Sequence, residues 1–373
     1  MISRANLPLF RPRLPSAAAI TPYLKAIDAA RWYSNGGPLV VSLEERIADY
    51  LGVPSDGVAS VANGTLGLDL ALQAMGAKPG TLCMMPSWTF AATPAAAQRA
   101  GLVPWFVDVD RASWALSPSA ALGLVRKAPG RIGAVMPVSV FGAPVDSIGW
   151  DRFMEATGIP VVIDMAAGFD TARPSRAPVM ISLHATKAVG AGEGGIVASQ
   201  DAGLVQDIRA RANFGMKKGS RLADLAGTNA KLSEYAAAVA HASLDAWPQT
   251  RRAIETLSNA YVQAFANRRG IMLSPGFGAG WVGSTCNVAL DVADSEGVIE
   301  SLAADGIEAG RWWRRGCHVQ RAFADCPRLP LPVTKDLGRR VIGLPFSVDM
   351  GADDVARVAA ALRSTVARAG LAA

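Results

Sequence analysis

The chain has 373 residues, of which 50% are hydrophobic and 18% charged, a composition typical of globular enzymes rather than disordered proteins. Its net charge of +6 comes from scattered basic residues, and runs such as Lys217-Lys218 are no longer than pairs. This pattern argues against nucleic-acid binding and suits an anionic small substrate. No apolar run is long enough to cross a membrane, and no signal-peptide core is present at the N-terminus. We therefore expect a soluble cytoplasmic protein.

The cysteines stand alone in unrelated segments and form no C-x-x-C motif. They are Cys83, Cys286, Cys317 and Cys326. Such isolated residues favour reduced thiols over a disulfide framework or a structural zinc site. We expect no bound metal.

Helices and strands are predicted to alternate through the first two thirds of the chain. The predicted helices cover residues 20–31, 40–51, 64–75, 91–100, 119–126 and 147–157. The predicted strands cover residues 58–62, 81–85, 103–107, 132–138, 159–163, 179–183 and 196–199. Runs such as 159–163 are apolar on both faces, as in buried strands of a largely parallel sheet with helices on both sides. The fold class is therefore predicted to be α/β.

Beyond residue 230 the pattern changes. A long helical region is predicted to about residue 269, with an interruption near Trp247-Pro248. A strand at 288–292 and helices at 295–305 and 353–368 then indicate a smaller α+β domain. We place the domains at 1–245 and 246–373.

One lysine, Lys187, lies between two strand-like pieces in a stretch rich in glycine. Glycines have no side chains and let a ligand approach the backbone closely, so a lone lysine among glycines suits a Schiff-base role. A glycine-rich hairpin with a solvated lysine fits the stretch equally well. Ser182 and His184 precede the lysine, and Glu193 follows it among the glycines. Residues 190–195 match G-x-G-x-x-G, but they precede a strand instead of opening a helix. A dinucleotide site is therefore rejected.

Three further features fall at the carboxyl ends of predicted strands, where ligands bind in open α/β sheets. Gly64 and Thr65 begin a helix and could hold a phosphate, or could form an ordinary helix start. Asp164 follows five apolar residues, and a protonated pyridine nitrogen would be a suitable partner, although helix capping is the alternative. Phe90 could stack on a planar ring or belong to the core.

A series of short motifs occurs in a fixed order along the chain. They are Asn63-Gly64-Thr65, Pro86-x-x-Thr89-Phe90-x-x-Thr93, Gly101-x-x-Pro104-x-Phe106-x-Asp108-Val109-Asp110, Pro137-Val138-x-x-Phe141-Gly142, Ile163-Asp164-x-Ala166-Ala167, Ser182-x-His184-Ala185-Thr186-Lys187, Gly192-Glu193-Gly194-Gly195 and Gly227-Thr228-Asn229-Ala230-Lys231-Leu232-Ser233-Glu234. Each motif alone is weak, but the ordered set resembles the DegT/DnrJ/EryC1/StrS family of sugar aminotransferases. The resemblance extends from about residue 7 to 360. It implies a fold-type I enzyme dependent on pyridoxal 5'-phosphate.

The resemblance implies a role for each matching residue. Gly64, Thr65 and Ser182 match the family's phosphate site, and Phe90 matches the residue that stacks on the cofactor ring. Asn229 matches an asparagine that reaches the phosphate from the neighbouring subunit. A homodimer with shared active sites is therefore expected.

The resemblance also implies the chemistry. Lys187 matches the Schiff-base lysine, and Asp164 matches the aspartate that keeps the pyridinium nitrogen protonated. An amino group would pass, in a ping-pong reaction, from a donor such as glutamate to a keto group of a nucleotide-linked deoxy sugar. The family's sugar dehydratases replace the lysine with histidine, so Lys187 argues against that branch.

The chain departs from the family pattern in places that bear on the substrate. Ala167 stands where glutamine or histidine is usual, and the tract from Asp164 to Lys187 is short. Residues 310–318 hold two tryptophans and three arginines, which could clamp a base or diphosphate or could form a surface hairpin. Candidate substrate-binding residues are Asn35, His184, Glu193, Arg311, Trp313 and His318.

Two other functions are compatible with these residues. An aminotransferase acting on a free cyclitol or another keto compound would use the same fold and the same lysine. A regulatory protein that binds the cofactor without turnover is the third possibility, and Ala167 keeps it open. The pair Lys187 and Asp164 favours an enzyme.

Overall fold

The large sheet of the computed structural model, which describes residues 6–266 and 268–371, is mostly parallel. Three strands pair in the order β3 (Val103–Val107), β2 (Leu82–Pro86) and β4 (Ile132–Val135). Four others pair in the order β5 (Ile163–Asp164), β6 (Val179–Ser182), β7 (Gly195–Ala198) and β1 (Val58–Val61). Parallel bridges from Val135 to Val161 and from Val138 to Asp164 join the two groups. Only β7 runs antiparallel to its neighbours within these groups.

Successive strand residues point to opposite faces of this sheet. Ile181 and Ile196 belong to one apolar cluster, while Met180 and Val197 belong to another. Helices α2 (Pro38–Leu51) and α6 (Ser147–Thr157) bury residues in the first cluster. Helices α3 (Gly64–Ala74), α4 (Ala92–Arg99) and α7 (Ala202–Ala212) bury residues in the second. Because both faces are covered, the predicted α/β fold with helices on both sides is confirmed.

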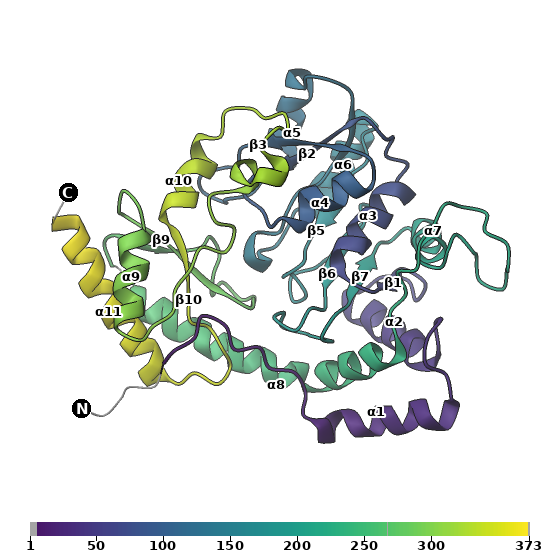
Figure 1. Ribbon diagram of the computed structural model, residues 1–373, viewed down its shortest axis with the longest axis horizontal. Helices are drawn as coiled ribbons and strands as arrows, with labels where there is room; N and C mark the ends of the chain where they lie inside the picture. The colour runs from purple at the N-terminus through teal and green to yellow at the C-terminus, as the bar shows by residue number, and fades with distance from the viewer. Residues whose placement is uncertain (1–5, 267, 372–373) are drawn as a thin grey trace.

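Helix α8 (Glu234–Phe265) is the long connection to the C-terminal part of the chain (Figure 1). It passes through Pro248 without a break, so the predicted interruption there is wrong. A proline removes one backbone hydrogen bond and tends to bend a helix, but neighbouring packing can hold the helix together. Trp247 beside it is buried in the core.

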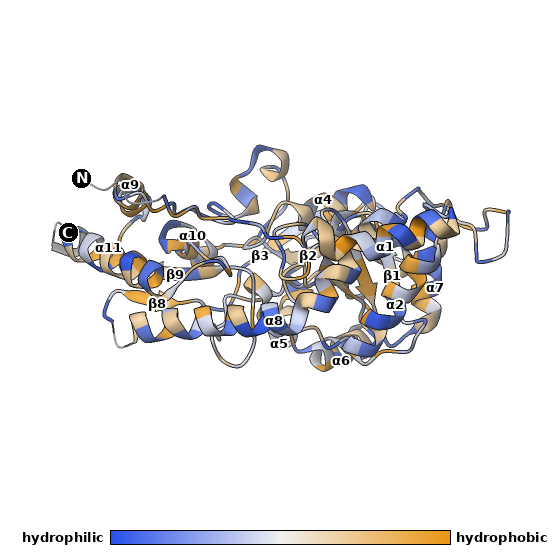
Figure 2. Ribbon diagram, turned by 90° about the horizontal axis from the view of Figure 1, so that it is seen from below, coloured by the Kyte–Doolittle hydropathy of each residue, from blue (hydrophilic) through white to orange (hydrophobic). Residues whose placement is uncertain are grey.

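A second, antiparallel sheet lies beyond α8, with strand order β10 (Val341–Leu344), β9 (Cys286–Leu290) and β8 (Ile271–Leu273). Helices α9 (Glu296–Ala304), α10 (Pro332–Arg340) and α11 (Ala352–Leu371) accompany it. Helix α1 (Ala17–Ala30) lies along α8 (Figure 1), and α5 (Pro118–Leu124) lies near α6. Figure 2 shows blue and orange residues interspersed along α1 and α8, as expected of helices with one face toward the core.

The segment between α7 and α8 extends away from the body of the molecule (Figure 1). It carries Phe214 and Leu222, whose side chains are exposed. Among the residues that the structure describes, no helix is both long and apolar enough to cross a membrane.

Candidate active site

Lys187 lies in the connection between β6 and β7, which folds back tightly on itself. The backbone N–H of Leu183 donates to Gly194 at 2.9 Å, that of Ala185 to Gly192 at 2.9 Å, and that of Lys187 to His184 at 2.9 Å. Gly192 has a φ of +85°, a backbone conformation that favours glycine. The glycines therefore serve to form the compact turn that holds Lys187.

Asp164, at the end of β5, is 4% exposed. Its Oδ2 accepts a hydrogen bond from the Thr93 hydroxyl at 2.8 Å, and its Oδ1 accepts one from the Ala166 N–H at 3.1 Å. Burial raises the pKa of this carboxyl, whereas these hydrogen bonds and the charge of Lys187 lower it. The carboxylate is thus placed where an added cationic partner would stabilise its charged form.

The amine of Lys187 feels the opposite effect. Burial lowers the pKa of Lys187, and the nearby charge of Asp164 counteracts that change. A lower pKa increases the fraction of neutral amine near neutral pH. Neutral amine is the form that attacks a carbonyl and accepts a proton.

Three backbone segments converge where a phosphate is expected. Gly64 is the first residue of α3, whose Asn63 cap accepts a hydrogen bond from Leu66 N–H at 3.0 Å. Ser182, the last residue of β6, pairs in register with Gly195. A Cβ atom on Gly195 would lie 2.9 Å from the Gly64 nitrogen. Only glycine allows this close approach, which puts Ser182 beside the positive end of a helix.

Phe90 completes this group of residues. Its side chain is 61% exposed, which is unusual for so large an apolar ring. Its carbonyl accepts a hydrogen bond from the N–H of Thr93 at 3.2 Å, and Thr93 in turn holds Asp164. An exposed aromatic ring, a buried carboxylate and a helix N-terminus fit a flat cationic ring that carries a phosphate. The residues present therefore suit pyridoxal phosphate.

Thr93 has a role that its motif did not reveal. Its hydroxyl lies 2.6 Å from that of Thr89 and donates to Asp164. The four-residue spacing of Thr89, which precedes α4, and Thr93, in the first turn of α4, was visible in the sequence. The orientation of Thr93 toward Asp164 was not visible, because it depends on how α4 packs against the end of β5.

Asn229 lies on the extended segment before α8 and is exposed. It forms an antiparallel bridge with Asn213, and the carbonyl of Ala230 next to it accepts a hydrogen bond from Ala62 at 2.7 Å. Its exposed position leaves the predicted contact with a neighbouring subunit as a prediction.

Two of the candidate substrate residues lie together beside Lys187. His184 Nε2 is 3.7 Å from the Glu193 carboxylate, and His184 Nδ1 is 2.8 Å from the Thr186 hydroxyl. Both side chains are partly open to solvent. Asn35, in contrast, lies in the exposed loop before α2, where its φ is 63°.

Arg311 does not present a free charge. Its guanidinium pairs with both Asp294 and Glu296, at the start of α9. Trp313 stacks on Phe141 with the ring centroids 4.3 Å apart, inside an apolar cluster. These contacts favour the structural alternative for both residues over a clamp on a diphosphate.

His318 is buried and its Nδ1 lies 2.8 Å from the hydroxyl of Ser87. The same hydroxyl accepts a hydrogen bond from the backbone N–H of His318 at 3.1 Å. Burial lowers the pKa of this histidine, which favours its neutral form. These contacts anchor residues 317–319 to the end of β2, close to the loop that carries Phe90.

A cavity of about 430 Å³ opens next to Lys187. Its walls come from the N-terminal arm, the lysine turn, α8 and the C-terminal part of the chain. Among the lining residues are Arg13, Thr186, Lys187, Ser243, Gln249, Ser284 and Ser347. Its size lies within the usual range for small-molecule sites.

The chain is similar to known proteins over nearly its whole length. Residues 16–363 match the model of the DegT/DnrJ/EryC1/StrS aminotransferase family. Protein Rv3402c of Mycobacterium tuberculosis is 31% identical over 97% of this chain and 91% of its own. A 3-amino-5-hydroxybenzoate synthase of Amycolatopsis mediterranei is 32% identical over 59% of this chain and 58% of its own.

A solved structure extends the similarity to three dimensions. The structure of DesI, determined in the presence of its TDP-sugar product, is 33% identical and superposes with a TM-score of 0.87. The match covers 98% of this chain and 94% of that one. The fold, the lysine turn and the family match agree, and the chain belongs to the DegT/DnrJ/EryC1/StrS family of pyridoxal-phosphate-dependent aminotransferases.

Proposed function

We propose that this enzyme transfers an amino group from glutamate to a keto group of a nucleotide-linked deoxy sugar. The observation that carries the proposal is the placement of Lys187 near the buried Asp164, whose hydrogen-bond partner Thr93 is held by the loop that exposes Phe90. Similarity to DesI over 98% of the chain supports the nucleotide-linked sugar. The net charge of +6 also favours anionic substrates of this kind.

Each residue of the proposed site has a distinct task. Bound pyridoxal phosphate supplies an electron sink for the carbon that loses a proton. Lys187 would hold the cofactor covalently, and its free amine would carry the proton to and from the substrate carbon. Asp164 would stabilise positive charge on the cofactor ring, Phe90 would offer that ring an aromatic face, and the start of α3 with Ser182 would bind the phosphate.

We propose further that two subunits share each active site. The exposed side chains of Phe214 and Leu222 provide apolar surface for a second copy. Asn229, on the same extended segment as Phe214, would then contact the cofactor phosphate of the partner. Such an enzyme would act in the cytoplasm on activated sugars destined for a polysaccharide.

A free cyclitol or another keto compound is the second candidate substrate. It is favoured by the ion pairs of Arg311 with Asp294 and Glu296, which occupy a cation otherwise suited to a diphosphate. The similarity to a 3-amino-5-hydroxybenzoate synthase also supports a substrate without a nucleotide.

A substrate panel separates these possibilities. The holoenzyme is incubated with glutamate and either TDP- or UDP-linked 3-keto and 4-keto deoxy sugars or a free keto-inositol, and the products are identified by mass spectrometry. We expect amination of a nucleotide-linked sugar. Amination of the free ketone alone would support the second candidate. Absence of any amination, with the cofactor bound, would support the non-catalytic alternative.

Covalent attachment of the cofactor tests the role of Lys187 directly. Borohydride treatment of the loaded wild-type enzyme should fix the cofactor to the peptide that contains Lys187. Lys187→Ala should lose this label and the activity but keep its fold. The exposed lysine variant Lys25→Ala serves as the matched control and should keep both. A wild-type enzyme without the label would refute the assignment.

A further inference from the structure

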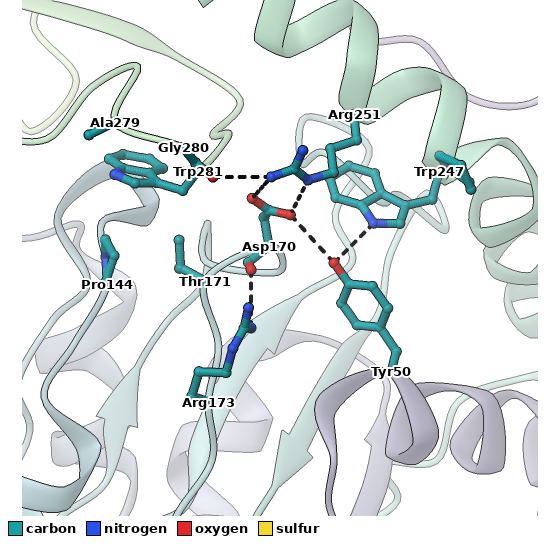
Figure 3. Close-up of a pocket in the computed structure, with 11 residues that line it drawn as sticks. Tyr50, Pro144, Asp170, Thr171, Arg173, Trp247, Arg251, Ala279, Gly280 and Trp281 are labelled. Carbon is teal, nitrogen blue, oxygen red and sulfur yellow. Dashed lines mark hydrogen bonds and ion pairs between the residues drawn. The ribbon is translucent and has the colours of Figure 1, made fainter.

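A second cavity, of about 650 Å³, lies apart from the lysine turn. It is formed by the end of α2, the tract after β5, the middle of α8 and the loop before β9 (Figure 3). None of its lining residues also lines the cavity beside Lys187. The residues of the proposed cofactor site do not line it either. Its volume is within the range of small-molecule sites.

The side chain of Asp170 is central to this cavity (Figure 3). Its carboxylate accepts hydrogen bonds from Arg251 at 2.8 Å and 3.3 Å, from the Val282 N–H at 3.0 Å and from the Tyr50 hydroxyl at 3.5 Å. Its negative charge and lone pairs are therefore already used within the protein. Asp170 holds the walls together and has little capacity left for a ligand.

Aromatic side chains form much of the wall. Tyr50 stacks on Phe169 with the ring centroids 4.7 Å apart, and its hydroxyl accepts a hydrogen bond from the Trp247 indole at 3.0 Å. Trp281 lies on the other side of the cavity, near Pro144 (Figure 3). These contacts already fix Tyr50 and Trp247 in place. Binding of a flat ligand would therefore cost little conformational entropy of these two side chains.

Arg173 supplies the charge that remains available. Its Nη1 donates to the carbonyls of Asp170 at 3.2 Å and Ala172 at 2.7 Å, which hold the guanidinium at the cavity. Within residues 6–266 and 268–371, no carboxylate lies within ion-pair distance of Arg173. Arg251 is balanced by Asp170 and Glu255. Arg173 is exposed to solvent, and its remaining N–H groups are therefore available to an anion next to aromatic faces.

We propose that this cavity is a second ligand site, which takes a flat ring carrying one anionic group. The ring would stack on Trp281, and the anion would accept hydrogen bonds from the free nitrogens of Arg173. An aromatic carboxylate and a nucleoside monophosphate share this chemistry. The site is independent of the proposed reaction, because it uses none of the residues that hold the cofactor.

Isothermal titration calorimetry on the holoenzyme tests this site. The probes are benzoate and uridine monophosphate, with benzamide, uridine and inorganic phosphate as controls that lack either the charge or the ring. We expect saturable binding of at least one probe and much weaker binding of the controls. Binding of benzoate alone identifies an aromatic acid as the ligand, and binding of the nucleotide alone identifies a nucleotide. Equal binding of inorganic phosphate would refute the role of the ring.

Substitutions locate the binding. Arg173→Gln and Trp281→Ala should each weaken probe binding by about tenfold or more. Arg176→Gln, a nearby exposed arginine paired with Glu155, should leave it unchanged. Lys187→Ala should also leave it unchanged, and full cofactor loading of the Arg173 and Trp281 variants would show that they fold. Binding that persists in both of these variants, or that is lost in Lys187→Ala, would overturn the proposal.

Discussion

Loss of solvation raises the pKa of Asp164 and lowers that of Lys187, and the charge of each residue partly offsets the shift of the other. The pKa of each side chain therefore depends on the charge of the other. Pyridoxal chemistry needs a lysine in its neutral amine form and a carboxylate that can pair with the protonated cofactor ring. The sequence predicted both residues, because a carboxylate after an apolar strand and a lysine among glycines are recognisable patterns. It did not predict Thr93 as the hydrogen-bond partner of Asp164.

Replacing Asp164 with asparagine should preserve cofactor attachment but slow amination by about 100-fold or more, because charge stabilisation of the ring is lost. The rate at which glutamate decreases the visible absorbance of the bound cofactor, followed over a single turnover, measures the amino-transfer step. Asp69→Asn, a buried carboxylate outside the site, is the control and should keep its rate. A near-normal rate for Asp164→Asn would show that the carboxylate has another purpose.

Thr93 should act by positioning Asp164. Its hydrogen bond lowers the pKa of Asp164, so Thr93→Val should raise that pKa. The carboxyl would then require a higher pH to ionise, and the acidic limb of the rate profile should move to higher pH. Thr93→Ser retains a hydroxyl and should restore the original profile. An unchanged profile in Thr93→Val would exclude this role.

At the scale of elements, Glu234 links the start of α8 to the first turn of α2. It is the first residue of α8, yet its carboxylate accepts hydrogen bonds from Leu39 N–H at 2.8 Å and Val40 N–H at 2.9 Å. Helix α2 has Gly37 at its cap and no side-chain cap of its own. The buried carboxylate therefore satisfies the first turn of α2 from a distant helix.

Glu234→Gln should destabilise the protein by about 1–3 kcal/mol, because one acceptor and the favourable charge at a helix N-terminus are lost. Urea unfolding followed by circular dichroism measures the change. Glu45→Gln, an exposed residue on α2, should change stability by less than about 0.5 kcal/mol. Equal stability of the two variants would contradict a capping role for Glu234.

Local patterns predicted most elements of the large sheet within a few residues, since buried apolar runs and helix caps are local signals. Helix α7 was not predicted, although Asp201 caps it by accepting from Leu204 N–H. Strands β8 and β10 were missed as well. Their residues form strands because of pairing with β9, which a local pattern does not contain.

At the scale of the whole molecule, the parallel sheet explains why distant residues meet. Gly64, Asp164 and Ser182 follow or end β1, β5 and β6, and such ends lie at one edge. That convergence could be predicted from strand order alone. The ion pairs of Arg311 could not, because they depend on how α9 packs against a loop. The domain boundary at residue 245 remains a prediction.

Mixed dimers test the shared site. A mixture of Lys187→Ala and Asn229→Ala subunits would form hybrid dimers in which one site has both residues intact. If Asn229 serves the partner's site, the mixture should recover about a quarter of wild-type activity. Each variant alone should have a much lower activity than the mixture. Failure of the mixture to exceed the sum of its parts would assign Asn229 to its own subunit.

Helix α8 has a consequence for how the protein unfolds. Ala237 and Ala240 near its start and Tyr261 and Phe265 near its end all belong to one apolar cluster, which includes strands of both sheets. Neither sheet can therefore lose its packing without exposing a face of this helix to water. The enzyme should behave as one cooperative unit, whose two parts melt together although each has a sheet of its own.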